Sequence, residues 1–196
     1  MLIRSTALFM VNVMTIFPKS ARWLSVLLLL VTVSPCNARI YYSKNEAMEL
    51  AFGPDAAVAM LSLFPTREQT DAIEKLARVK LDSSLFTFYV GKKDDKVLGY
   101  AAIETRTVRT KPETLLVVLT PEGALRNIYT LAFHEPPEYQ PPERWYEQMY
   151  GRPIEQLDFN AGIQGISGAT LSTRSALSST RKVMAVYQIM LKKGQD

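Results

Sequence analysis

The sequence predicts an α+β fold: a single domain in which a mainly antiparallel sheet is packed by helices, after an N-terminal signal segment. Apolar and β-branched residues gather in four short segments between residues 85 and 133, which is typical of strands. Helical patterns with capping signals lie before and after these segments. Because the segments follow one another with short turns, as in a meander, we expect antiparallel neighbours with helices packed on one side of the sheet.

The first 38 residues are predicted to be a signal peptide or an N-terminal anchor. They contain no Asp or Glu, and Lys19 and Arg22 precede an apolar run over residues 23–33. The small and polar residues that follow, up to Ala38, resemble a cleavage region. This pattern predicts a periplasmic or otherwise exported protein, cleaved after Ala38. Retention of the segment as an uncleaved anchor stays open.

Charge and composition exclude several classes of function for the rest of the chain. Of the net charge of +4, the three basic residues of the leader supply three, which leaves +1. We therefore expect no nucleic-acid binding. Cys36 lies in the leader and His134 is the only histidine, so disulfides, attached haem and a His-rich metal site are not expected after residue 38. With this composition, any redox chemistry in the exported chain would need an organic cofactor.

Residues 39–84 are predicted to be a helical N-terminal part. Capping boxes open two of its helices, at Ser43–Glu46 and at Thr66–Gln69. The Ala-rich apolar stretch 56–64 is predicted to be helical as well.

Four strands and a Pro-rich connection follow. The strands are predicted at 85–90, 97–108, 115–119 and 125–133. The Pro-rich segment 134–142 excludes regular structure, and a short helix is predicted over Trp145–Tyr150.

The tetrapeptide Ser167-Gly168-Ala169-Thr170, near the C-terminus, is the most informative motif of the chain. Gly168 and Ala169 carry almost no side chain, so the backbone can bend there and nothing bulky shields the Thr170 hydroxyl. Asp158 stands nine positions before Ser167.

An amphipathic helix is predicted just after this motif. Its N-terminus is expected a few residues beyond Thr170, in the Ser- and Thr-rich stretch 171–175, with Arg181 and Lys182 on its outer side. Free N–H groups and partial positive charge at a helix N-terminus suit a phosphate. Arg174 would add a charged contact.

The motif resembles the flavinylation motif of the FMN-binding domain family, in which a Thr or Ser hydroxyl carries FMN through a phosphoester bond. The order of the surrounding pieces is similar too. Gly99-Tyr100 lies on a strand pair, His134-Glu135-Pro136-Pro137 follows a second hairpin, and a stretch with Trp145 precedes the motif. The resemblance covers roughly residues 85–191, and it departs from the family at Pro136, where Thr is usual.

The resemblance implies a set of site residues. Thr170 would accept the FMN phosphate, and His134 and Glu135 would lie near the isoalloxazine ring. The motif read by a flavin transferase would consist of Asp158, Ser167, Gly168 and Ala169. Trp145 could stack on the flavin. Plain structural roles remain open for Asp158 as the cap of a turn, for His134 as a loop residue and for Trp145 as an edge residue of the core.

By the same resemblance, residues 85–196 would form an FMN-binding domain with FMN bound covalently on Thr170. The protein would be an exported electron carrier rather than a stand-alone enzyme, matured by a flavin transferase. Its redox partners would be cytochromes or membrane quinol oxidoreductases, with membrane association if the leader is kept. A small flavin-dependent reductase with its own substrate and a non-redox interaction module are the alternatives.

Overall fold

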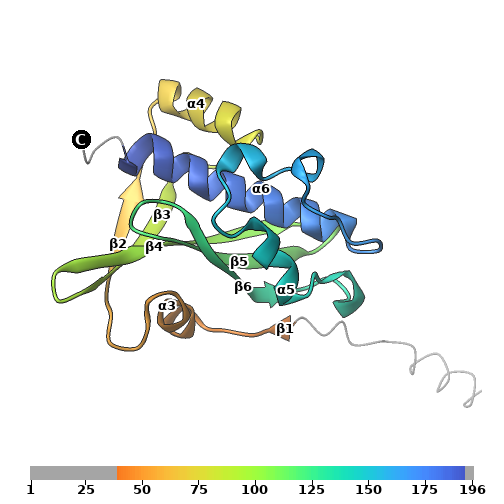
Figure 1. Cartoon of the computed structure of the whole chain (residues 1–196), viewed down its shortest axis with the longest axis horizontal. Helices are drawn as coiled ribbons and strands as arrows, with labels where there is room; N and C mark the ends of the chain where they lie inside the picture. The colour runs from red at the N-terminus through yellow and green to blue at the C-terminus, as the bar shows by residue number, and fades with distance from the viewer. Residues whose placement is uncertain (1–38, 193–196) are drawn as a thin grey trace, which may run out of the picture. The chain divides into compact units, whose positions relative to one another are not determined.

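An antiparallel sheet of six strands organises residues 39–192, the part of the chain that this computed structural model describes (Figure 1). The strands are β1 (Arg39–Ile40), β2 (Ala57–Leu63), β3 (Phe86–Lys93), β4 (Lys96–Thr107), β5 (Pro112–Leu119) and β6 (Leu125–Phe133). Their order across the sheet is β1-β6-β5-β4-β3-β2, and every neighbouring pair is antiparallel. The predicted fold class is therefore confirmed. The predicted leader lies outside the described residues.

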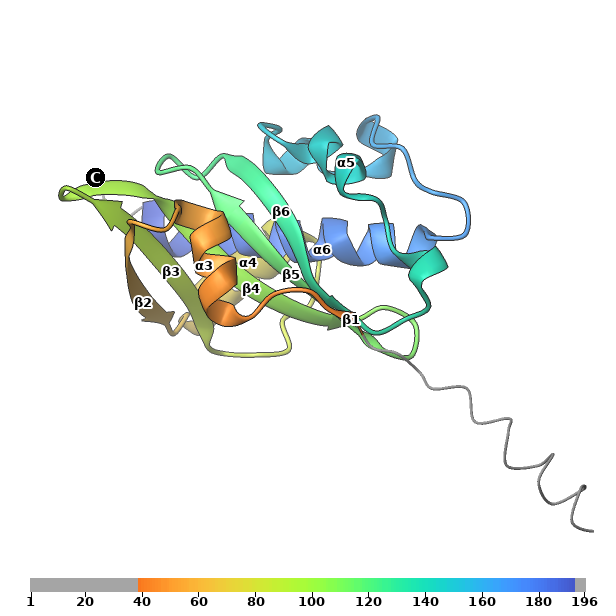
Figure 2. The same cartoon turned by 90° about the horizontal axis from the view of Figure 1, so that it is seen from below.

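Helices cover both faces of this sheet, so the expectation of helices on one side is wrong. Helices α4 (Arg67–Ala77) and α6 (Thr170–Val186) lie on one face, and α3 (Lys44–Phe52) lies on the other (Figure 2). The physical reason is visible in β5, whose residues Leu115 to Leu119 are at most 1% exposed. A strand that is apolar on both faces needs a covering layer on each.

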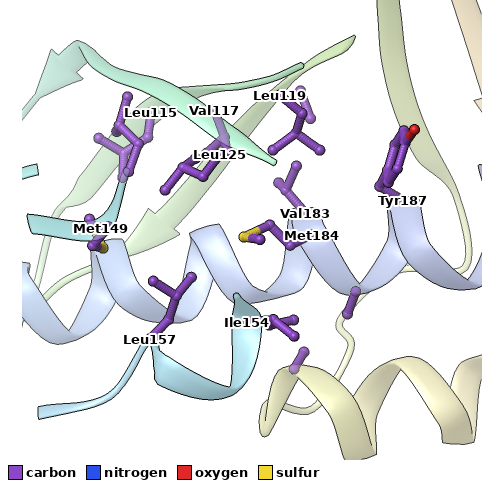
Figure 3. Close-up of a cluster of buried hydrophobic side chains, with 14 of the residues drawn as sticks. Leu115, Val117, Leu119, Leu125, Met149, Ile154, Leu157, Val183, Met184 and Tyr187 are labelled. Atoms are coloured by element: carbon purple, nitrogen blue, oxygen red, sulfur yellow. The ribbon is translucent and has the colours of Figure 1, made fainter. Parts of the chain in front are cut away.

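The larger core lies between the sheet and α6. Leu115, Val117 and Leu119 of β5 point toward this helix, where Val183 and Met184 meet them (Figure 3). The smaller core lies under α3 and includes Leu116 and Val118, the alternate residues of the same strand. The odd-numbered side chains of β5 therefore face α6.

The predicted helix over 56–64 is wrong, because this stretch is strand β2. It pairs with β3 from Ala57 opposite Lys92 to Leu63 opposite Phe86. Alanine favours helix, yet propensity is a weak prior that tertiary context overrides. Residues 39–84 therefore contain two strands as well as two helices.

Both predicted capping boxes are confirmed. The Ser43 and Glu46 pair starts α3, and the Thr66 and Gln69 pair starts α4, each with reciprocal side-chain and backbone hydrogen bonds. These local signals fix the helix starts because they satisfy N–H groups that have no acceptor within the helix.

Short helical turns connect β6 to α6. They are η1 (Pro137–Tyr139), α5 (Glu143–Tyr146), η2 (Glu147–Met149), η3 (Ile154–Gln156) and η4 (Phe159–Ala161); a π-helical turn, η5 (Tyr187–Leu191), follows α6. The short helix predicted at Trp145–Tyr150 is confirmed as α5 and η2. The Pro-rich segment holds one regular piece, the 3-10 turn η1.

Arg181 and Lys182 of α6 turn inward, contrary to the expected outer position. Lys182 is 7% exposed and forms an ion pair with Glu104 at 2.6 Å. The Arg181 guanidinium donates hydrogen bonds to the carbonyls of Ala77 and Leu157. Partners on neighbouring elements therefore satisfy both charges beneath the surface, which a single-helix pattern does not reveal.

Candidate functional site

Helix α6 begins at Thr170 itself, earlier than expected. Its N-cap residue is Ala169, which is buried, while Gly168 before it has a φ of 87°. The Thr170 side chain is exposed, and its hydroxyl donates a hydrogen bond to the Ile166 carbonyl at 3.2 Å. Ser172 and Thr173, expected as caps, lie inside the helix and are buried.

The N-terminus of α6 is electrostatically unbalanced. Ala169 has no side chain that can cap the helix, and the first turn contains no acidic residue. The first backbone N–H groups of a helix have no acceptor within it, and they carry the positive end of the helix dipole. An anion attached to Thr170 would therefore meet unpaired donors without a dedicated basic pocket.

Arg174 strengthens this positive end. It is exposed and follows Thr170 by four residues, so the two side chains lie on the same face of α6. Within residues 39–192 its guanidinium has no hydrogen bond or ion pair. Arg174 is thus free to contact a phosphate on Thr170, as the sequence predicts.

The motif before Thr170 depends on glycine for its backbone. A side chain at Gly168 would meet no atom within 4 Å, so the space there is open. Its positive φ, however, is a conformation that L-residues adopt only with strain. Ser167 is exposed beside it. Ser167 and Gly168 therefore lie on an accessible turn, and the buried Ala169 follows them directly.

Glu135 lies close to Gly168 of this motif. Together with Val108, Tyr139, Gly168, Leu171 and others it lines a small cavity of ≈ 80 Å³. One carboxylate oxygen of Glu135 accepts hydrogen bonds from the N–H groups of Arg109, Thr110 and Lys111. These bonds, first of all that from Thr110, hold the pKa of Glu135 below its usual value.

His134 has a less direct place. It is half-buried, and its backbone N–H donates to the Pro112 carbonyl at 3.1 Å. This bond fixes the chain just before Glu135. His134 precedes the cavity-lining Glu135 in the chain but does not itself line the cavity.

Asp158 lies far from Thr170. Its carboxylate pairs with Arg78 at 2.8 Å and with Arg181 at 3.8 Å. The N–H of Asn160, which Asp158 caps, lowers the pKa of Asp158 most, and the two arginines add to this. Since Arg181 follows Thr170 by eleven residues, the axial separation is about 16 Å. In the folded domain Asp158 therefore caps a turn and pairs charges.

Trp145 is a core residue. It is 5% exposed, its ring packs edge-on against Tyr146, and its indole N–H donates to the Gln164 carbonyl at 2.6 Å. Its role in the folded chain is to anchor the loop that leads to Ser167. A flavin could not stack on it without rearrangement of this contact.

Glu113 is a site residue that sequence reasoning missed. It lies on β5, is 1% exposed, and neither carboxylate oxygen has a hydrogen-bond partner among the described residues. Burial raises its pKa to about 7. The available signal was its spacing, because Glu113 continues the odd-numbered row of Leu115, Val117 and Leu119 that faces the core.

The residues at the start of α6 fit the phosphate of FMN better than they enclose its ring. Ligand pockets commonly enclose roughly 300–1,000 Å³, whereas the cavity beside Gly168 has ≈ 80 Å³. An attached ring system would therefore lie largely at the surface, against Leu171, which is 46% exposed. Among residues 39–192 there is no group of three or more His, Cys, Asp or Glu that could hold a metal ion.

Comparison with known proteins adds no relative, because no family model, no curated protein and no solved structure matches the chain. The resemblance to the FMN-binding domain family rests on the motifs quoted above and stays a prediction. None of the helices in the described part is long and apolar enough to cross a membrane.

Proposed function

We propose that the protein is an exported electron carrier that holds FMN through a phosphoester on Thr170. One observation carries the proposal: the Ser-Gly-Ala-Thr motif ends in an exposed hydroxyl on the first residue of a helix of 17 residues that has no side-chain cap. A phosphoester there needs stabilising donors, and the start of α6 offers backbone N–H groups and the unpaired Arg174.

FMN would supply one- and two-electron chemistry, so the carrier could link two-electron donors to one-electron carriers such as haems. The protein's own residues would hold and orient the cofactor. Leu171, Val108 and Tyr139 offer apolar contact to one part of the ring, and the remainder would stay exposed to partners. Cytochromes or membrane quinol oxidoreductases are the proposed partners, and a flavin transferase would attach the cofactor.

Strand β1 lies next to the proposed site. Arg39, the first described residue, pairs with Phe133 at the end of β6. Glu135, which lines the cavity beside Gly168, follows two residues later. The described part of the chain thus begins beside the proposed flavin site.

The intact mass of the protein tests the proposal. The unmutated chain and the variants Thr170→Ala and Thr170→Ser are produced with and without a flavin transferase. A gain of FMN minus water is expected in the unmutated chain and in Thr170→Ser, which keeps a hydroxyl, and only with the transferase. A gain that persists in Thr170→Ala would overturn the assignment of Thr170.

Two further outcomes separate the alternatives. A colourless protein with no mass gain under all conditions would favour a non-redox interaction module. Steady turnover of a defined substrate by the loaded protein alone would favour a small flavin-dependent reductase. Electron exchange with a reduced cytochrome, without such turnover, supports the carrier.

A further inference from the structure

Glu113 stands out as a buried acid with no partner beneath the proposed site. Its side chain shares the α6-facing row of β5 with Leu115 and Val117, and both carboxylate oxygens are buried without a hydrogen bond within the described part of the chain. An unpaired carboxylate in such surroundings is far more costly than the protonated acid. The group is therefore poised between its two protonation states near neutral pH.

Two buried serines of α6 lie nearby: Ser175 is close enough to Glu113 to affect its pKa, and Ser172 lies three residues earlier on the same helix. Ser172 is 1% and Ser175 is 6% exposed, and the hydroxyl oxygens of both lack partners among residues 39–192. Three residues apart, they lie on the same face of the helix. The proximity of Ser175 acts against the rise in the pKa of Glu113, although the two side chains form no hydrogen bond in this structure. A hydroxyl can donate to a carboxylate or accept from a carboxylic acid, so the serines suit either state of Glu113.

The other groups that face Glu113 leave its charge uncompensated. Arg106 lies opposite it on β4 and is half-buried, but it forms no ion pair with it. Tyr146 of α5 donates to or accepts from Thr130 at 3.1 Å, and its pKa is raised by burial and by the nearby Glu113. On β6 the opposite residue is Phe133, which is apolar. Proton exchange is thus the simplest way for Glu113 to adjust its charge.

Ser172 links this cluster to the attachment site. It follows Thr170 by two residues and lines the same small cavity as Gly168 and Glu135. With a rise of about 1.5 Å per residue, Ser172 and Ser175 lie about 3 Å and 8 Å along the helix axis from Thr170. A charge placed on Thr170 therefore lies about 8 Å along the helix axis from Ser175, the residue of α6 beside Glu113.

We propose that Glu113, together with Ser172 and Ser175, is a redox-linked proton site for the group carried on Thr170. The inference rests on the proposed function. When a one-electron donor such as a reduced haem is oxidised and passes its electron to that group, the Glu113 carboxylate takes one proton from water and becomes a carboxylic acid. When the electron leaves to an oxidised partner, the acid returns the proton to water. The net charge of the loaded protein is then the same before and after reduction.

The expected coupling is large enough to measure. Two unit charges about 10 Å apart, at an effective permittivity of about 20, shift a titration by about one pH unit. Reduction of the attached group should therefore move the midpoint of the Glu113 titration upward by about that amount. In the pH range between the two midpoints, the midpoint potential of the group should fall as pH rises.

The test follows the carboxyl of Glu113 by carbon NMR in the full chain, with Glu113→Gln to assign the signal. The titration is recorded in the unloaded protein, in the loaded oxidised protein and after reduction with dithionite. A midpoint well above the ordinary glutamate value of 4.5, with a further rise on reduction, supports the proposal. A midpoint at that ordinary value, or one that reduction leaves unchanged, overturns it.

A second readout separates a proton site from a structural role. The midpoint potential of the loaded protein is measured against pH in the unmutated chain, in Glu113→Gln and in the control Glu49→Gln on α3. Only Glu113→Gln should lose the fall of the midpoint potential with rising pH. Ser175→Ala should keep this fall but shift the pH range in which it occurs. Equal curves in all four proteins would overturn the proposal. Intact mass is checked first, so failure of flavin attachment is recognised separately from failure of the coupling.

Discussion

Replacing Glu113 by glutamine should change how the stability of the unloaded domain depends on pH. Burial raises the pKa of Glu113 from an ordinary 4.5 to about 7. The folded state therefore binds the proton more tightly than the unfolded state does. Stability from this group is fully present below the unfolded pKa, falls as pH rises from about 4.5 to about 7, and is constant above that.

The magnitude follows from the size of this shift. A rise of 2.5 units, from 4.5 to about 7, corresponds to about 3 kcal/mol between the acidic and alkaline limits. About 2.5 kcal/mol of this loss falls between pH 5 and pH 8. In Glu113→Gln this part of the pH dependence should disappear, because the amide does not titrate.

Urea unfolding at these two pH values measures the effect. The quantity compared is the change in free energy of unfolding from the lower to the higher pH, in the unmutated chain, in Glu113→Gln and in the exposed control Glu49→Gln. Glu104, whose pKa burial also raises, contributes equally to all three proteins and cancels. If Glu113→Gln loses as much stability over this interval as the other two, the reasoning about the buried carboxyl is refuted.

Three further substitutions, one with a matched control, test the scaffold of the site by urea unfolding. Gly168→Ala should lower the free energy of unfolding by about 1 kcal/mol because of the positive φ of Gly168. The control Gly165→Ala, whose added carbon meets Phe159 at an ordinary 3.6 Å, should cost less. Equal costs would count against the argument from backbone strain. Trp145→Phe keeps an aromatic ring but loses the bond to Gln164, so a loss of about 1 kcal/mol is expected; an unchanged midpoint would show that the bond adds nothing. Glu135→Gln should cost about 2 kcal/mol at neutral pH. Since the folded pKa of Glu135 is lowered, this cost should shrink as pH falls through it, and a constant cost would contradict the assignment.

Local sequence signals predicted the parts of the fold that local physics decides. The capping boxes at Ser43 and Thr66 each satisfy N–H groups within three residues, so no knowledge of the rest of the chain is needed. The continuous apolar run of 115–119 likewise identified a buried strand. The same run is apolar on both faces, so it requires a helix layer on each side of the sheet.

Long-range partners decided the parts that the sequence did not predict. Strand β2 forms because β3 offers an edge over seven residue pairs, and nothing within 56–64 reports that edge. Lys182 is buried because Glu104 lies 2.6 Å away on β4. The place of Asp158 depends in the same way on Arg78, eighty positions earlier in the chain.

Within its first two turns, α6 carries both side chains that face solvent and side chains that are buried. Thr170 and Arg174 face solvent, whereas Ser172 and Ser175 are buried and Ser175 lies beside Glu113. Because one rigid helix of about 10 Å diameter carries both sets, a negative phosphoester on Thr170 must itself raise the proton affinity of Glu113, before any electron arrives. A titration shift on attachment alone would therefore show only that the phosphate is near. The additional shift on reduction is what distinguishes an electron carrier from a protein that merely bears a flavin.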